Sequence, residues 1–138
     1  MVTGFTGSRK GMTVNQLLEL GERLEELIPC KAIHGSCIGA DTDFHDYLRE
    51  HTDILIEIYP SNIESQRALC VADIAHPPEA PLVRNRHIVD NSDVLIAAPS
   101  TLKEEKRSGT WATIRYAHKC KKRVVILRPE ISTLEGLF

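Results

Sequence analysis

The stretch His34-Gly35-Ser36-Cys37-Ile38-Gly39-Ala40-Asp41 lies between a short apolar run and an amphipathic run. This order predicts a strand, a glycine loop and a helix, in which backbone N–H groups and the helix N-terminus can meet an anion. Gly35 permits a turn away from the strand, and Gly39 permits close backbone approach. Asp41 or Thr42 is expected to cap the helix. The alternative is a tight turn with an ordinary cap and no ligand.

Outward from this stretch, apolar and β-branched runs predict about five strands. They are expected at Val2–Thr6, Lys31–His34, Asp53–Tyr59, Asp93–Ala98 and Arg123–Leu127. The third run is almost continuously apolar, which is typical of parallel strands covered on both faces. A short tail is expected from Pro129 onward.

Helical patterns lie between the expected strands. They cover about 13–28, where Thr13 and Gln16 form a capping box, and then Thr42–Glu50, Leu82–Asn91 and Gly109 to about Lys121. The segment Ser61–Pro81 is expected to be an extended loop that borders a site, with a short helix around Gln66–Val71 as an option.

Strands that alternate with helices predict one α/β domain over residues 1–138, with a parallel sheet and helices on both faces. Right-handed crossovers favour the strand order 3-2-1-4-5. Ligands bind at the carboxyl ends of strands beside the topological switch, which here lies between strands 1 and 4. The loops Thr6–Thr13 and Pro99–Thr110 are expected there, with the Gly35 loop beside them. This convergence favours a binding site over three unrelated turns.

Residues suited to binding an anion occur in three further segments. Gly7, Ser8 and Arg9 follow the first strand, Arg84 and Asn85 lie on one helix, and Ser108, Gly109 and Thr110 begin another. N–H groups at a helix start and arginine forks both suit phosphate. We expect Arg84→Ala to weaken a bound ligand and to leave the fold intact. Each segment also has a plainer reading, as a solvated loop, a surface helix or a helix cap.

The composition limits the classes of function. The chain has 42% hydrophobic and 26% charged residues and a net charge of −2, so no global field recruits nucleic acid. No apolar run reaches the length of a membrane span, and no signal peptide is visible. Four cysteines without a CxxC pair favour reduced thiols in the cytoplasm. His34 and Cys37 alone supply too few ligands for a zinc site, so no metal or cofactor is expected.

Several motifs follow one another along the chain: Thr6-Gly7-Ser8-Arg9, the stretch from His34 to Asp41, Tyr59-Pro60, Arg84-Asn85, residues 93–99, and Ser108-Gly109-Thr110. Together they resemble the SLOG superfamily, which contains the DNA-processing protein DprA and the LOG phosphoribohydrolases. The chain looks most similar to a small stand-alone group described as nucleoside 2-deoxyribosyltransferase-like. The resemblance covers Val2 to about Leu127.

The resemblance implies a Rossmann-like domain that binds a nucleotide or nucleotide-derived ligand, as a sensor or a sequestering module. It implies ligand contacts at Gly7, Ser8, Arg9, Gly35, Gly39, Asp41, Arg84, Asn85, Gly109 and Thr110. Ser36 and Ser108, from the same loops, complete the expected set. A homo-oligomer, taken as a dimer, is also expected, and Trp111 and Ile114 are the sequence features that motivate it.

Two other functions stay open. One is hydrolysis or transfer at the N-glycosidic bond of a nucleotide, with Asp41, Glu104 and Glu105 as candidate catalytic carboxylates. LOG enzymes carry a catalytic glutamate three residues after their Gly-Thr pair, and Thr113 stands at that place here. A hydroxyl cannot do the work of that carboxylate. The other function is a nucleic-acid-associated module similar to DprA, which the net charge disfavours.

Overall fold

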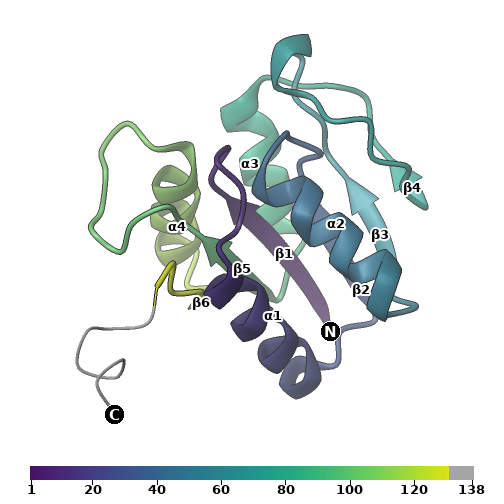
Figure 1. Ribbon diagram of the computed structural model, residues 1–138. Helices are drawn as coiled ribbons and strands as arrows, with labels where there is room; N and C mark the ends of the chain where they lie inside the picture. Colours follow the sequence, from purple (N-terminus) through teal and green to yellow (C-terminus); the bar gives the residue numbers. More distant parts are fainter. Residues whose placement is uncertain (131–138) are drawn as a thin grey trace.

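The structure, a computed structural model, describes residues 1–130. They form an α/β domain around a six-stranded parallel sheet in the order β4-β3-β2-β1-β5-β6 (Figure 1). The strands are β1 (Val2–Gly7), β2 (Lys31–His34), β3 (Leu55–Ile58), β4 (Ile74–Ala75), β5 (Val94–Ala98) and β6 (Arg123–Ile126). The predicted order is therefore confirmed, with one strand more than predicted. Of the expected tail after Pro129, residues 131–138 lie outside the described part of the chain.

The additional strand, β4, lies at the edge of the sheet beside β3. It has two residues, and both are exposed. Asp73 fixes its start, because the Asp73 carboxylate accepts from the N–H of Ile56 at 2.8 Å and the N–H of Asp73 donates to the carbonyl of Ile56 at 2.9 Å. Pro77 and Pro78 follow and prevent a longer ladder. Neither length nor periodicity could reveal such a strand in the sequence.

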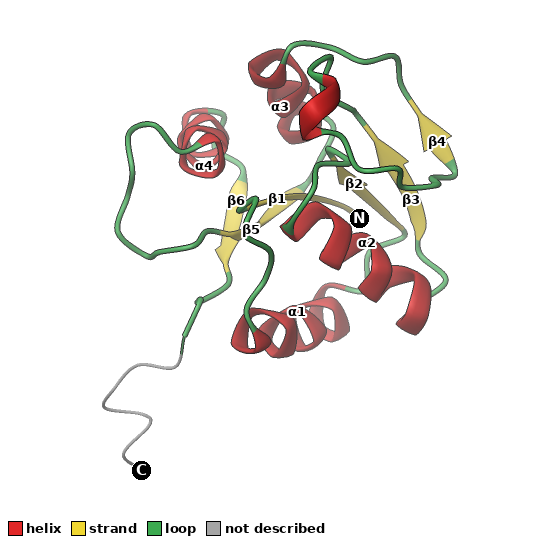
Figure 2. Ribbon diagram, turned by 45° about the horizontal axis from the view of Figure 1, so that its top comes forward, coloured by secondary structure: helices red, strands yellow, loops and turns green. Residues whose placement is uncertain are grey.

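The helices cover both faces of the sheet, as predicted. They are α1 (Val14–Leu27), α2 (Ala40–His51), α3 (Pro81–Asp90) and α4 (Gly109–Lys119). Figure 2 shows α1 and α2 on one face and α3 and α4 on the other. Phe5, stacked on Phe44 at 4.2 Å between ring centroids, lies in the core on the α1–α2 face. The optional helix around Gln66–Val71 is instead a single 3₁₀ turn, η1 (Glu64–Gln66).

The start of α2 differs from the prediction. Gly39, with φ of 97°, is the N-cap residue, and neither Asp41 nor Thr42 caps the helix through its side chain. Both side chains instead bond backward to the loop: the Asp41 carboxylate accepts from the N–H of Cys37, and the Thr42 hydroxyl donates to the carbonyl of Cys37. The helix therefore begins two residues earlier than expected, and these two hydrogen bonds hold the glycine loop against its first turn.

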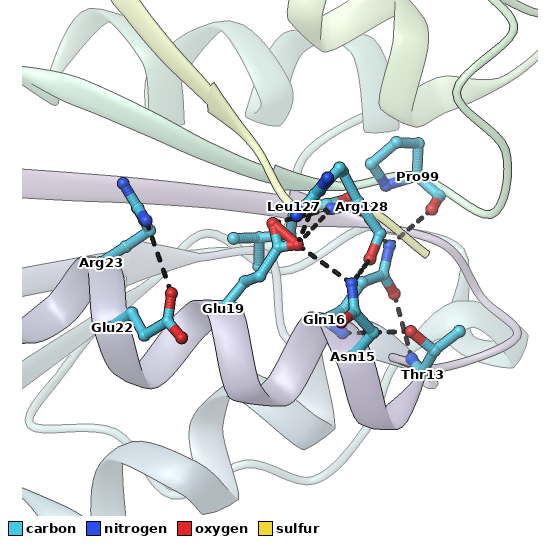
Figure 3. A network of polar contacts seen from close by, with 9 residues as sticks. All are labelled: Thr13, Asn15, Gln16, Glu19, Glu22, Arg23, Pro99, Leu127 and Arg128. Carbon is cyan, nitrogen blue, oxygen red and sulfur yellow. Dashed lines mark hydrogen bonds and ion pairs between the residues drawn. The ribbon is translucent and has the colours of Figure 1, made fainter. Parts of the chain in front are cut away.

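The start of α1 is hydrogen-bonded to the segments that follow β5 and β6. The predicted capping box of Thr13 and Gln16 is present. The amide of Gln16 also donates to the carbonyls of Pro99 at 2.7 Å and Leu127 at 3.2 Å, just beyond β5 and β6 (Figure 3). Because Gln16 is buried, these bonds satisfy an amide that would otherwise be costly to bury. They hold the start of α1 beside the carboxyl ends of these strands.

Trp111 lies in the first turn of α4 and packs with Ala97 and Ile114 in a small core cluster. Its indole Nε1 is buried and has no hydrogen-bond acceptor among residues 1–130. Trp111 and Ile114 are therefore interior residues and offer no exposed face for self-association. No helix in the described part of the chain has the length and apolar character needed to cross a membrane.

Candidate functional site

A cavity of about 340 Å³ lies beyond the carboxyl ends of β1, β2 and β5, where the topology places the switch point. The structure brings ten of the twelve predicted ligand residues to its walls: Gly7, Ser8, Arg9, Gly35, Asp41, Arg84, Asn85, Ser108, Gly109 and Thr110. These residues come from three loops and from the starts of α2, α3 and α4. The walls are largely polar, which suits an anionic or highly polar ligand more than a lipid.

Ser36 and Gly39 do not line the cavity. Ser36 is buried with φ of 51°, and its hydroxyl donates to the carbonyl of Ala68 at 3.1 Å. A Cβ on Gly39 would collide with the backbone of Arg9. The two residues shape the glycine loop from behind, and Gly39 lets the loop after β1 pack directly on the start of α2.

The guanidinium of Arg84 forms hydrogen bonds with other residues of the protein. The guanidinium is buried, and its Nη1 donates to the carbonyls of Gly35 at 2.9 Å and Tyr59 at 3.2 Å. Its Nε donates to Asn85 Oδ1 at 2.6 Å, and its Nη2 donates to Cys37 Sγ at 2.9 Å. A side chain with these bonds fixes three segments around the cavity. We therefore revise the expectation that Arg84→Ala would leave the fold intact.

Asp41 is the carboxylate on the cavity wall. It is buried, and its Oδ2 accepts from the N–H of Cys37 at 3.1 Å. Burial raises the pKa of Asp41 to about 6, against the lowering effect of the nearby Arg84 guanidinium and the backbone N–H donors. Asp41 is therefore a carboxyl group that changes charge just below neutral pH.

Cys37 also lines the cavity, and the sequence left open whether the nearby helix start lowers its pKa. The structure gives the opposite direction. Burial raises the pKa of the Cys37 thiol, and the Asp41 carboxylate raises it further, against a smaller lowering by Arg84. The thiol is therefore protonated at neutral pH, which does not suit a nucleophile.

The positive charge that remains available comes from Arg9 and Arg107. Both line the cavity, both are exposed, and neither forms an ion pair within residues 1–130. Arg107 was missed in the sequence, because nothing distinguishes it from the other cations of the loop 99–108. Gln66 and Ser100 were also missed as wall residues, since each lies in a segment without a motif.

The start of α4 faces the same cavity. The Ser108 hydroxyl accepts from the N–H of Trp111 at 3.2 Å and so caps the helix. The N–H groups of Gly109 and Thr110 have no acceptor in the described part of the chain. Free N–H groups at a helix start, next to Arg107, form a favourable position for an anion.

The candidate carboxylates of the outer loop are not in the cavity. Glu104 forms an ion pair with Arg115 at 2.9 Å, and Glu105 accepts from the hydroxyl of Thr101 at 2.9 Å. Thr113, at the place of the LOG glutamate, is buried and donates to the carbonyl of Gly109 at 2.9 Å. Of the three candidate catalytic residues, only Asp41 reaches the cavity.

One cluster of metal-ligand residue types was not visible in the sequence. The side chains of His34, His45 and Cys70 converge, with their ligand atoms within 4.8 Å of one another. The N–H of Ser36 donates to His34 Nδ1 at 2.9 Å, so the neutral ring carries its proton on Nε2. That Nε2 lies 2.9 Å from His45 Nδ1 and donates to it. Burial lowers the pKa of His34 to about 3, which keeps the ring neutral.

A metal ion on this cluster would have to replace the Nε2 proton of His34 while Nδ1 still accepts from a backbone N–H. The ring would then be an imidazolate, whereas metal-bound histidines ordinarily keep a proton on the second nitrogen. The residues therefore fit a buried hydrogen-bonded chain and do not fit a metal site.

No family model and no curated protein matches the chain. Two solved structures are similar to it. One is the molybdenum cofactor binding protein from the phototrophic bacterium Rippkaea orientalis, with a TM-score of 0.69, 21% identity, and coverage of 99% of this chain and 80% of that chain. The other is TM1055, a structural genomics target, with a TM-score of 0.64, 18% identity, and coverage of 89% and 71%. These likenesses, together with the strand order, define the chain as a Rossmann-like α/β protein.

Proposed function

We propose that this protein is a small SLOG-type domain that binds a nucleotide or nucleotide-derived ligand through its phosphate, as a sensor or a sequestering module. One observation carries the proposal: Arg9, Arg107 and the free N–H groups at the start of α4 converge on a cavity at the topological switch point. Phosphate suits this arrangement, because it accepts several charge-assisted hydrogen bonds at once.

The remaining walls suit the uncharged part of such a ligand. Asn85 and Gln66 present amides, and Asp41 presents a buried carboxyl group. We propose that the sugar and base lie toward these residues, while the phosphate lies toward Arg107. Four unpaired cysteines fit a protein of the reducing cytoplasm, which we propose as its compartment.

Calorimetry and thermal unfolding with the mono-, di-, tri- and cyclic nucleotides of the four ribonucleosides test the proposal. A ligand at 100 times its dissociation constant raises the free energy of unfolding by about 2.7 kcal/mol. The nucleoside without phosphate is the matched control, and it should bind much more weakly. If no nucleotide raises the midpoint at millimolar concentration, or if the nucleoside binds as tightly, the proposal is wrong.

A second candidate ligand is the molybdenum cofactor, because one similar structure is described as a molybdenum cofactor binding protein. The same cavity is the proposed site, because the phosphate of this cofactor would meet Arg9 and Arg107. Loading the protein with this cofactor and measuring retained molybdenum after gel filtration separates the two candidates. Retention that a nucleotide competes away would show one shared site.

We also propose that the protein is a dimer. Because Trp111 and Ile114 are buried, the exposed side chains of Leu82 and Val83 on α3 are the better candidates for the contact. Light scattering should give about twice the chain mass of 15.5 kDa. A particle with the mass of a single chain at high concentration would contradict it.

A further inference from the structure

A groove of about 430 Å³ runs between α1 and α2, on the outer side of the helix layer. Figures 1 and 2 show these two helices side by side on one face of the sheet. They approach closely at Gly21, where a Cβ would lie 2.7 Å from the hydroxyl oxygen of Tyr47. The groove is separate from the cavity described above, because the two share no lining residue.

The walls of the groove are two helical stripes of different character. The α1 stripe is apolar and consists of Val14, Leu17, Leu18 and Gly21. The α2 stripe carries three carboxylates and the ring of Tyr47, and its residues are Asp43, Asp46, Tyr47 and Glu50, with His51 at its end. Each stripe follows the i, i+3, i+4, i+7 spacing of one helix face. Val14 is 75% exposed and Leu18 is 63% exposed, although both lie on a helix that packs on the core.

Two neighbouring stripes with this spacing form the surface on which a third helix packs. We propose that the groove between α1 and α2 docks an amphipathic helix of a partner protein, with its apolar stripe on α1 and lysine or arginine side chains facing α2. The charge comes from Asp43, Asp46 and Glu50, of which Glu50 lies 3.8 Å from the ring of His51, and no lysine or arginine among residues 1–130 lines the groove. Cations on the partner helix would therefore meet complementary charge.

A second copy of this chain fits the groove less well. In a two-fold symmetric contact the same surface patch is used on both chains. The acidic α2 stripe of one copy would then meet either the acidic stripe or the apolar stripe of the other copy, and neither stripe supplies a lysine or arginine among residues 1–130.

The groove is connected to the loop that follows β1. The Asp43 carboxylate accepts from the N–H of Met12 at 2.8 Å, and Met12 follows the cavity residues 7–9 in the same loop. A partner helix bound to α2 would therefore lie next to a residue, Asp43, that is hydrogen-bonded to the loop after β1.

The test uses a synthetic peptide of about 20 residues, because isolated helices shorter than about 12–15 residues are only marginally stable in water. It carries leucine at i, i+3, i+4 and i+7, lysine along one flank, and a fluorescent label for anisotropy. A second peptide has glutamate in place of every lysine. No nucleotide is present, so the outcome is independent of the proposed ligand.

Two pairs of variants locate the binding. Leu18→Ser removes an apolar wall residue that is 63% exposed, and its control is Leu102→Ser, because Leu102 is 51% exposed and lies outside both the groove and the cavity. Asp46→Lys combined with Glu50→Lys reverses the charge of the α2 stripe. Its control is Glu64→Lys combined with Glu105→Lys, which changes the net charge equally at exposed positions that do not line the groove.

We expect the lysine peptide to bind with a dissociation constant in the range of about 1–100 μM and the glutamate peptide to bind at least about tenfold more weakly. Each groove variant should weaken the lysine peptide about tenfold, while the controls change it less than about twofold. Absence of binding at millimolar peptide, equal binding of both peptides, or equal losses in the controls would overturn the proposal. If Leu18→Ser but not Leu102→Ser dissociates an oligomer of the free protein, the groove is an interface between copies and the proposal is also wrong.

Discussion

The guanidinium of Arg84 and the carbonyl oxygen of Gly35 are joined by a hydrogen bond of 2.9 Å that links α3 to the loop after β2. The two residues also fit together by shape, because a Cβ on Gly35 would collide with that guanidinium. The glycine is therefore required by close approach of a side chain. Its φ is not in the left-handed region, which in this loop is occupied by Ser36 and Gly39.

We expect Arg84→Ala to lower the free energy of unfolding by about 2–4 kcal/mol, because it leaves the buried carbonyls of Gly35 and Tyr59 without their donor. Urea unfolding measures the change. Arg86→Ala is the control, since Arg86 is exposed on the same helix and its guanidinium lies over the ring of Tyr116, 5.3 Å from the centroid. Equal stability of the two variants would place Arg84 outside the structural network.

Arg107→Ala should weaken a phosphate-bearing ligand about 10–100-fold, since a charge-assisted hydrogen bond contributes about 1.5–3 kcal/mol. The midpoint of unfolding should stay unchanged, because the Arg107 side chain is exposed. Lys103→Ala, in the same loop but outside the cavity lining, is the matched control. Titration calorimetry decides: a loss of the same size in both variants would indicate only a long-range effect of charge.

Asp41 and His34 should give the stability opposite dependences on pH. The pKa of Asp41 is raised to about 6, so its contribution to the free energy of unfolding is largest below pH 4 and is lost as the pH rises toward 6. The pKa of His34 is lowered to about 3, so its contribution is lost as the pH falls from about 6.5 toward 3. In the wild type the two effects partly cancel.

Asp41→Asn removes the part of the stability that decreases as the pH rises, and the asparagine keeps an oxygen that can accept from the N–H of Cys37. We therefore expect the stability of this variant to rise more steeply between pH 4 and pH 6 than that of the wild type, by an amount of the order of a few kcal/mol. Urea unfolding at several pH values measures the slopes. Parallel curves for the two proteins would show that Asp41 keeps an ordinary pKa.

A bound ligand should protect Cys37 from alkylation. Cys37 lines the cavity, whereas Cys30 is exposed and lies outside it. Because the pKa of Cys37 is raised, labelling with iodoacetamide is best done near pH 8.5, followed by peptide mass spectrometry. Slower labelling of Cys37 with unchanged labelling of Cys30 is expected. Equal slowing at both cysteines would mean that the ligand acts elsewhere.

We expect no efficient release of free base from nucleoside monophosphates. Thr113 has no carboxylate, and its hydroxyl is bonded to the carbonyl of Gly109 within α4. The carboxylate of Glu104 is paired with Arg115 and does not line the cavity. Loss of positioned acid–base catalysis costs roughly 10²–10⁴-fold in rate. Chromatography of the incubated ribo- and deoxyribonucleotides checks this. Turnover near about 1 s⁻¹ that Asp41→Asn abolishes would instead make the protein an N-glycosidase that uses Asp41.

The topology and most of the cavity wall could be predicted, because both depend on local patterns. Apolar runs, glycine loops and helix starts specify strand order, and strand order places the loops together. The role of Arg84 could not be predicted, since its acceptors are backbone carbonyls more than twenty residues away. The same holds for His34 and His45, whose contact depends on how α2 packs on the sheet. The two-residue β4 has no pattern of its own.

Trp111 is the only tryptophan of the chain, so ultraviolet emission excited at long wavelength has a single origin. Its indole N–H is buried and has no acceptor in the described part of the chain, and its neighbour Thr110 forms part of the cavity wall. Emission from the folded protein should therefore be blue-shifted and should respond when the start of α4 receives an anion. The chain thus carries an intrinsic fluorophore next in sequence to a wall residue of its candidate site, and we expect binding to be measurable without an added dye.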